Sequence, residues 1–212
     1  SMSDNLDINF NKIIKNNLID VNSANKKKLT DSMIDRLILN KERILSMQDG
    51  LHQIIKIPDT LYKTTKGVRQ SNGITVSQMR VPLGVIGMIY ESRPNVTIDS
   101  AGLCIKSGNS VILRGGSESI NSNKALMTCI TKALKDNGVH QHMVQLVGTT
   151  DRSAVTHLLS KNKHIDVIIP RGGKGLIEKI ISCSKIPTIK HLDGNCHVYI
   201  DETADMNKAV NI

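Results

Sequence analysis

The chain has 212 residues and a formal net charge of +9, with 39% hydrophobic and 22% charged residues, which is the balance of a soluble globular protein. No stretch approaches the roughly 18 apolar residues of a membrane span, and the polar N-terminus has no apolar signal core, so we expect a cytoplasmic location and no membrane partner. Aromatic residues are only 2%, with no Trp, so we expect no nucleic-acid partner, and the positive charge fits a solvated lysine surface or small anionic ligands.

The first part of the chain, residues 1–65, is predicted to be a helical segment. Apolar residues recur at helical intervals through its second half, and Thr30 or Asp31 is placed to cap the start of that pattern. Gly50 is the expected break between two helices. Pro58 ends the pattern because proline cannot continue the hydrogen-bond ladder.

Residues 66–84 change to a period of two, which is typical of strands. The pair Asn72-Gly73 predicts a tight hairpin turn, and apolar residues such as Ile74 and Val76 alternate with polar ones. We therefore predict a hairpin arm that reaches beyond the rest of the fold.

From residue 85 to residue 212, apolar strand-like runs alternate with helical patterns. The expected strands are 84–91, 110–116, 143–148, 165–173, 186–192 and 197–201, and the expected helices are 95–108, 119–138, 151–162, 174–185 and 202–212. Repeated strand–helix units force parallel pairing with right-handed crossovers. The prediction is an α/β fold with a doubly wound, mostly parallel sheet of the Rossmann type, with ligands at the carboxyl ends of its strands.

The sequence Arg-Gly-Gly occurs twice at the end of a predicted strand and before a helix, at 114–116 and at 171–173. Paired glycines let backbone N–H groups approach a ligand, and a helix start adds free donors and partial positive charge. Arg114 and Arg171 add cations that suit phosphate. These loops predict either a dinucleotide or other phosphate ligand, or tight turns that each carry a solvated arginine.

Arg93 and Asn95 follow the first buried strand and also stand before a helix. A cation and an amide donor in this place can bind a carboxylate or stabilise an oxyanion. The alternative is an asparagine cap beside a surface arginine.

The cysteines form no CxxC pair and the histidines no HExxH pair, so we expect no metal site and no disulfide framework. Cys196 stands beside His197 and close to His191, which raises the possibility of a thiolate nucleophile with a base. Adjacent residues of a strand point to opposite faces, so His197 would face away, whereas His191 lies across a turn. The alternative is that Cys196 packs as a small apolar residue.

Four stretches carry a resemblance to a known family: "RVPLGVIGMIYESRPNVTID", "KSGNSVILRGG", "IDVIIPRGGKGL" and "GNCHVYIDE". From about residue 31 to residue 212 the chain resembles the γ-glutamyl phosphate reductases of the aldehyde dehydrogenase superfamily. The resemblance implies an aldehyde dehydrogenase type of Rossmann-like fold. It also implies NADPH-dependent reduction of L-glutamyl 5-phosphate to L-glutamate 5-semialdehyde and phosphate in proline synthesis, through a cysteine thioester.

The resemblance makes residues 85–212 a dinucleotide-binding domain and assigns its site residues. The loop on the adenosine side of the cofactor would be Arg114, Gly115, Gly116, Ser117 and Glu118. The loop near the pyrophosphate would be Arg171, Gly172 and Gly173. Arg93 and Asn95 would contact the substrate.

The family's nucleophile stands in an Arg-Pro-x-x-Cys-Asn segment, which we expect beyond Ile212, so no catalytic cysteine is expected within these residues. The catalytic and oligomerisation parts are then also expected outside them, this chain alone is expected to be inactive, and the full-length protein is expected to form a homo-oligomer through its arm. Oxidative relatives carry a water-activating glutamate near Lys190 and His191, and a reductase must avoid such hydrolysis. The alternative is a stand-alone, non-catalytic module that binds a phosphorylated metabolite.

Overall fold

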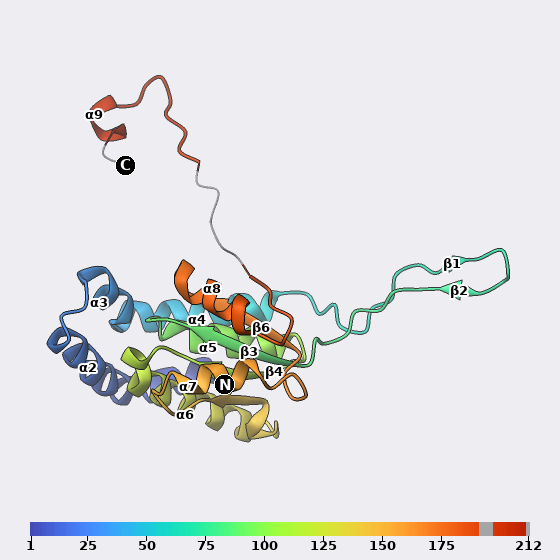
Figure 1. The fold of residues 1–212 in the computed structure, drawn as a ribbon, viewed down its shortest axis with the longest axis horizontal. Coiled ribbons are helices and arrows are strands. Elements are labelled where there is room, and N and C mark those ends of the chain that lie inside the picture. The colour runs from blue at the N-terminus through green and yellow to red at the C-terminus, as the bar shows by residue number, and fades with distance from the viewer. Residues whose placement is uncertain (191–196, 211–212) are drawn as a thin grey trace.

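The computed structural model describes residues 1–190 and 197–210 and shows helices around a parallel sheet (Figure 1). The sheet has the strand order β5-β4-β3-β6, and its strands are β3 (Val85–Tyr90), β4 (Ser110–Arg114), β5 (Val144–Leu146) and β6 (Val167–Arg171). The helices are α1 (Met2–Ile8), α2 (Phe10–Lys26), α3 (Asp31–Leu37), α4 (Lys41–Lys56), α5 (Asn95–Lys106), α6 (Ile120–Asp136), α7 (Ser153–Leu159), α8 (Lys174–Cys183) and α9 (Met206–Ala209), with 3-10 turns η1 (Ser117–Ser119) and η2 (Gln141–Met143). The predicted α/β fold with a parallel sheet is confirmed.

The two faces of the sheet are covered by different helices, as a doubly wound sheet requires. Successive residues of β3 alternate between the faces. Ile86 and Tyr90 join the core that α5 and α6 cover, whereas Ile89 joins the core that Leu158 of α7 and Ile180 of α8 complete. An almost wholly apolar strand is therefore needed in the middle of the sheet, since both of its faces are buried.

The N-terminal helices share the first of these cores. α1 and α2 pack against α6, and α4 packs against α5. Leu6, Ile13 and Met47 lie in one buried cluster with Ile86 of the sheet. The helical segment is therefore packed as part of the same body as the sheet.

The predicted start of α3 is confirmed, but the predicted break at Gly50 is wrong. The side chain of Thr30 accepts a hydrogen bond from the backbone N–H of Met33, as a helix cap does. The break lies before Lys41, where the side chain of Asn40 caps α4 at 2.8 Å from the N–H of Arg43. Gly50 lies inside α4, where a Cβ would make only an ordinary contact with Asp99 of α5, at 3.6 Å.

A buried carboxylate joins α2 to the start of α6. Asp20 is only 2% exposed. Its two oxygens accept hydrogen bonds from the backbone and side-chain N–H groups of Asn121, at 3.2 and 2.7 Å, and from the N–H and hydroxyl of Ser122, both at 2.7 Å. We call these contacts the α2–α6 junction. The negative charge also suits the partial positive charge of a helix N-terminus.

The predicted arm is present and projects from the body (Figure 1). Its strands β1 (Val68–Arg69) and β2 (Thr75–Val76) pair antiparallel. The chain reverses at the predicted place, where the N–H of Gly73 donates to the carbonyl of Gln70 at 2.9 Å and Gly73 adopts φ +88°. Only glycine takes this left-handed conformation without a steric cost.

The predicted strands at 186–192 and 197–201 are not formed in the part of the chain that the structure describes. Thr188 makes an isolated parallel bridge to Ile168, and residues 197–201 are exposed and take part in no sheet. An apolar run becomes a strand only where a neighbouring strand accepts its backbone hydrogen bonds. Among the described helices, none is long and apolar enough to cross a membrane.

Candidate functional site

Three of the predicted site loops meet at one edge of the sheet. Because β3, β4 and β6 are parallel, their carboxyl ends lie side by side, with Ile89 paired to Arg114 and Tyr90 paired to Arg171. The two Arg-Gly-Gly loops therefore flank the loop that carries Arg93. The sequence placed these loops correctly, although the roles of their residues stay predictions.

Arg114 points into the protein and leaves one donor without an acceptor. Its side chain is only 6% exposed, and it donates to the backbone carbonyls of Gly115, Thr150 and Asp151. Its Nε has no hydrogen-bond partner among the described residues. Burial lowers the pKa of Arg114, although the nearby Glu118 opposes this effect. A buried cation with an unused donor fits an anionic cofactor, since such a group is costly to leave unpaired.

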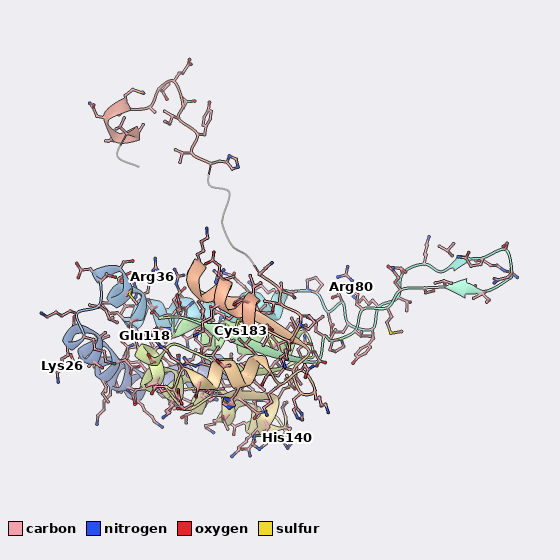
Figure 2. All side chains as sticks on the ribbon, in the orientation of Figure 1. Lys26, Arg36, Arg80, Glu118, His140 and Cys183 are labelled. Atoms are coloured by element: carbon pink, nitrogen blue, oxygen red, sulfur yellow. The ribbon has the colours of Figure 1, made fainter. Side chains whose placement is uncertain are left out.

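Glu118, which is labelled in Figure 2 and predicted to contact the cofactor, holds the neighbouring loop. Its Oε1 accepts hydrogen bonds from the N–H of Ser92 at 2.8 Å and from the hydroxyl of Ser92 at 2.6 Å. Burial raises the pKa of Glu118, but the hydrogen bonds from Ser92, from the backbone of Glu118 and from Ser117 together outweigh burial, and the pKa lies below its ordinary value. Ser92 takes the unusual φ of +27°, so Glu118 stabilises a strained turn.

Gly115 lies against a buried chain of polar side chains. The hydroxyl of Tyr90 is 2.7 Å from that of Thr97, which donates to Asn123 at 3.0 Å. Burial raises the pKa of Tyr90 to about 12, so the phenol stays protonated. A Cβ added at Gly115 would overlap the side-chain amide of Asn123 and press on the ring of Tyr90.

Gly115→Ala is therefore expected to lower the free energy of unfolding by about 1–3 kcal/mol, because the packed polar chain must shift. Gly175→Ala is the matched control, since a Cβ there meets nothing within 4 Å and lies in helix α8. Urea unfolding followed by circular dichroism measures both variants. Equal stability of the two would show that the space at Gly115 is not limiting.

The second Arg-Gly-Gly loop already binds a carboxylate. The N–H of Gly173, at the start of α8, donates to Oε2 of Glu91 at 2.9 Å. A Cβ on Gly172 would come within 2.8 Å of the Glu91 carboxyl carbon. A side-chain anion thus occupies the place where a helix N-terminus binds phosphate. Glu91 was not predicted as a site residue, because only the pairing of β3 with β6 brings it there.

Two neighbouring cavities border the loop that follows β3. The loop cavity, of about 280 Å³, is lined by Glu91, by the second Arg-Gly-Gly loop and by Arg36 and Arg93. The α3–α5 cavity, of about 340 Å³, is lined by Asn95 and Asp99 together with the same two arginines. Arg36 was not predicted as a site residue. It stands in no motif, and only the packing of the N-terminal helices brings it to the site.

Asn95 and Asp99 are joined within the first turn of α5. The side-chain N–H of Asn95 donates to Oδ2 of Asp99 at 3.0 Å. Burial raises the pKa of Asp99 above its ordinary value, and the bond from Asn95 partly offsets this. A side-chain amide has two N–H donors, so Asn95 keeps a second one for a ligand.

The described cysteines are poorly suited to nucleophilic attack. Cys104 and Cys129 are buried, and burial raises the pKa of each thiol to about 11. Cys183 ends α8, about 14 Å along the helix from its start beside the loop cavity. Cys196 and His191 lie outside the described residues, so the nucleophile interpretation of that pair stays a prediction. The part of the chain that the structure describes holds no cluster of three or more metal-ligating side chains.

Comparisons with known proteins agree with the fold. The profile of the Aldehyde dehydrogenase family matches residues 30–212. A γ-glutamyl phosphate reductase from Ruthia magnifica is 50% identical over 207 residues, which are 98% of this chain and 49% of the relative. A crystal structure of γ-glutamyl phosphate reductase from Thermotoga maritima superposes with a TM-score of 0.88 at 38% identity and covers 99% of this chain and 51% of that one. The enzyme from Saccharomyces cerevisiae gives 0.82 at 35% identity, with 100% and 54% covered. The chain thus spans about half the length of the relatives it matches.

Proposed function

The chain belongs to the aldehyde dehydrogenase family, and on this premise we propose that it forms the cofactor-binding part of a γ-glutamyl phosphate reductase. The reaction is the NADPH-dependent reduction of L-glutamyl 5-phosphate to L-glutamate 5-semialdehyde and phosphate in proline synthesis. The observation that carries the proposal is the meeting of both Arg-Gly-Gly loops with the Arg93–Asn95 loop at one edge of the sheet. The reductases named above, at 35–50% identity, support it.

Each loop has a part in this proposal. NADPH, when bound, supplies the hydride. Arg114 and its loop would hold the anionic adenosine side of the cofactor. Arg171 and the start of α8 bind the pyrophosphate, which requires Glu91 to give up the N–H of Gly173. Asn95 holds the carbonyl oxygen of the substrate as negative charge develops on it, and Arg93 meets the substrate phosphate.

The nucleophilic cysteine is proposed to come from a segment other than those that carry Cys104, Cys129 and Cys183. Buried thiols with a raised pKa give little thiolate at neutral pH. The 212-residue chain would then bind cofactor without turning over substrate. The apolar side chains of the arm, including Val68 at 63% and Ile74 at 59% exposure, fit a contact with another subunit of a homo-oligomer.

The protein expressed from its complete gene is expected to oxidise glutamate 5-semialdehyde with NADP+ only when phosphate is present.

Arg114→Ala is expected to raise the Kd for NADPH about tenfold or more, because it removes a buried charged donor, and Arg93→Ala is expected to change it less. Calorimetry measures both. Equal effects would show that one arginine is misplaced.

A stand-alone module that binds a phosphorylated metabolite is the second candidate. It is favoured by the burial of Cys104 and Cys129, which leaves the described loops with a binding site but no nearby reactive thiol. This candidate predicts that the product of the complete gene binds NADPH or a phosphate ester and shows no phosphate-dependent oxidation. Turnover in that assay would exclude it.

A further inference from the structure

The α3–α5 cavity combines unpaired charges of both signs. Arg43, on its wall, is already engaged, since it donates to the carbonyl of Ile38 and pairs with the carboxylate of Asp35 at 2.8 Å. Arg36 and Asp99 line the same cavity and make no ion pair among residues 1–190 and 197–210. The cavity thus offers the cations of Arg36 and Arg93 and one half-buried carboxylate to a ligand.

The carboxylate lies one helical turn from the proposed reacting end. Asp99 follows Asn95 by four residues on α5, and its Oδ2 lies 3.0 Å from the side-chain nitrogen of Asn95. In an extended glutamyl group the α-nitrogen is separated from the reacting carbonyl carbon by C–C and C–N bonds that together span about 5 Å. A carbonyl oxygen held by the second N–H of Asn95 therefore leaves the α-ammonium group within reach of the Asp99 carboxylate.

We propose that the α3–α5 cavity binds the amino-acid end of the substrate, with Asp99 accepting from the α-ammonium group and Arg36 binding the α-carboxylate. The assignment rests on the proposed function for the identity of the reacting group. Arg93 stands two residues before Asn95, at the reacting end, so Arg36 is the cation left for the carboxylate. The two residues make the site select an α-amino acid from among aldehydes and acyl phosphates.

A half-buried carboxylate without a cationic partner is costly, which supports a ligand as its partner. Burial raises the pKa of Asp99, and an ammonium group would return it toward its ordinary value. Asp99 also accepts a hydrogen bond from the side chain of Asn95. This bond gives Asp99 a second role, which is to orient the side-chain amide of Asn95. The two roles predict different results, because orientation affects every substrate whereas ammonium recognition affects only amino acids.

The test uses the protein expressed from its complete gene and three aldehydes. Glutamate 5-semialdehyde carries both α-groups, 5-oxopentanoate lacks the amino group, and pentanal lacks both. Asp99→Asn keeps an acceptor for Asn95 and is expected to raise KM about 10- to 100-fold for glutamate 5-semialdehyde alone. Arg36→Gln is expected to raise KM for the first two aldehydes but not for pentanal. Asp31→Asn, at the exposed start of α3, is the control and should change none of them.

An equal loss of turnover on all three aldehydes in Asp99→Asn would overturn the assignment and leave Asp99 as a residue that only orients Asn95. If both variants discriminate among the three aldehydes as the unmodified protein does, the assignment is also overturned, while the reductase function would stand. Calorimetry with L-glutamate separates the remaining case. If the unmodified protein oxidises no aldehyde yet binds L-glutamate, and Asp99→Asn abolishes that binding, the proposed function fails and the amino-acid site stands. If it neither oxidises an aldehyde nor binds L-glutamate, both fail.

Discussion

Asp20→Ala is expected to lower the free energy of unfolding by about 3 kcal/mol or more, because it leaves buried donors without an acceptor. The N–H groups of Asn121 and Ser122 and the hydroxyl of Ser122 all donate to this one carboxylate at the α2–α6 junction. Hydrogen bonds to an ionised acceptor are stronger than those to a neutral one. Water cannot easily replace the carboxylate, since Asp20 is only 2% exposed.

Urea unfolding followed by circular dichroism measures the loss. Asp20→Asn keeps the shape but turns one acceptor into a donor, so an intermediate loss is expected. Asp7→Ala, at an exposed position on α1, is the control and should stay within about 0.5 kcal/mol of the unmodified chain. A loss at Asp20 no larger than that at Asp7 would contradict the junction as a source of stability.

Asn95→Ala is expected to lower kcat of the protein expressed from its complete gene by about 10²- to 10³-fold, with a smaller change in KM. In the proposed reaction, the N–H that does not bond to Asp99 meets the substrate oxygen as it becomes negative. That interaction strengthens in the transition state, so its loss lowers turnover more than binding. Asn95→Asp, which replaces the N–H donors with oxygen, should be at least as impaired.

Steady-state kinetics with glutamate 5-semialdehyde, phosphate and NADP+ measure the effect. Asn16→Ala on the exposed face of α2 is the control, and circular dichroism checks that the Asn95 variants keep their fold. A loss of less than about fivefold in a folded Asn95→Ala protein would exclude Asn95 as the oxyanion donor, since one such donor is worth far more.

The sequence was informative where a local pattern decides the structure. The apolar run at β3 predicts a buried central strand because both faces of a parallel sheet are covered, and Gly73 predicts a turn because only glycine takes its conformation freely. An apolar pattern also predicted a strand at 197–201, and this prediction was wrong. A strand needs a neighbouring strand to pair with, and a local sequence pattern does not indicate whether one is present.

The candidate site could be predicted in part, for the same reason. Strand ends in a parallel sheet share one edge, so the Arg114 and Arg171 loops could be placed together from their positions after strands. Arg36 and Glu91 could not be placed at the site from the sequence. Arg36 lies on α3 and Glu91 follows β3, and only tertiary packing brings α3 beside α5 and β3 beside β6. The break before α4 was missed because the side chain of Asn40 decides it and Gly50 does not.

The α2–α6 junction also constrains the order in which the protein is built on the ribosome. α2 is synthesised long before Asn121 and Ser122, which lie 101 and 102 residues beyond Asp20. Until those residues have emerged, the apolar faces of α1 and α2 have no α6 to cover them, and Asp20 stays in water. The helices made first therefore reach their native contacts late, and nascent chains halted before α6 should expose these faces to chaperones.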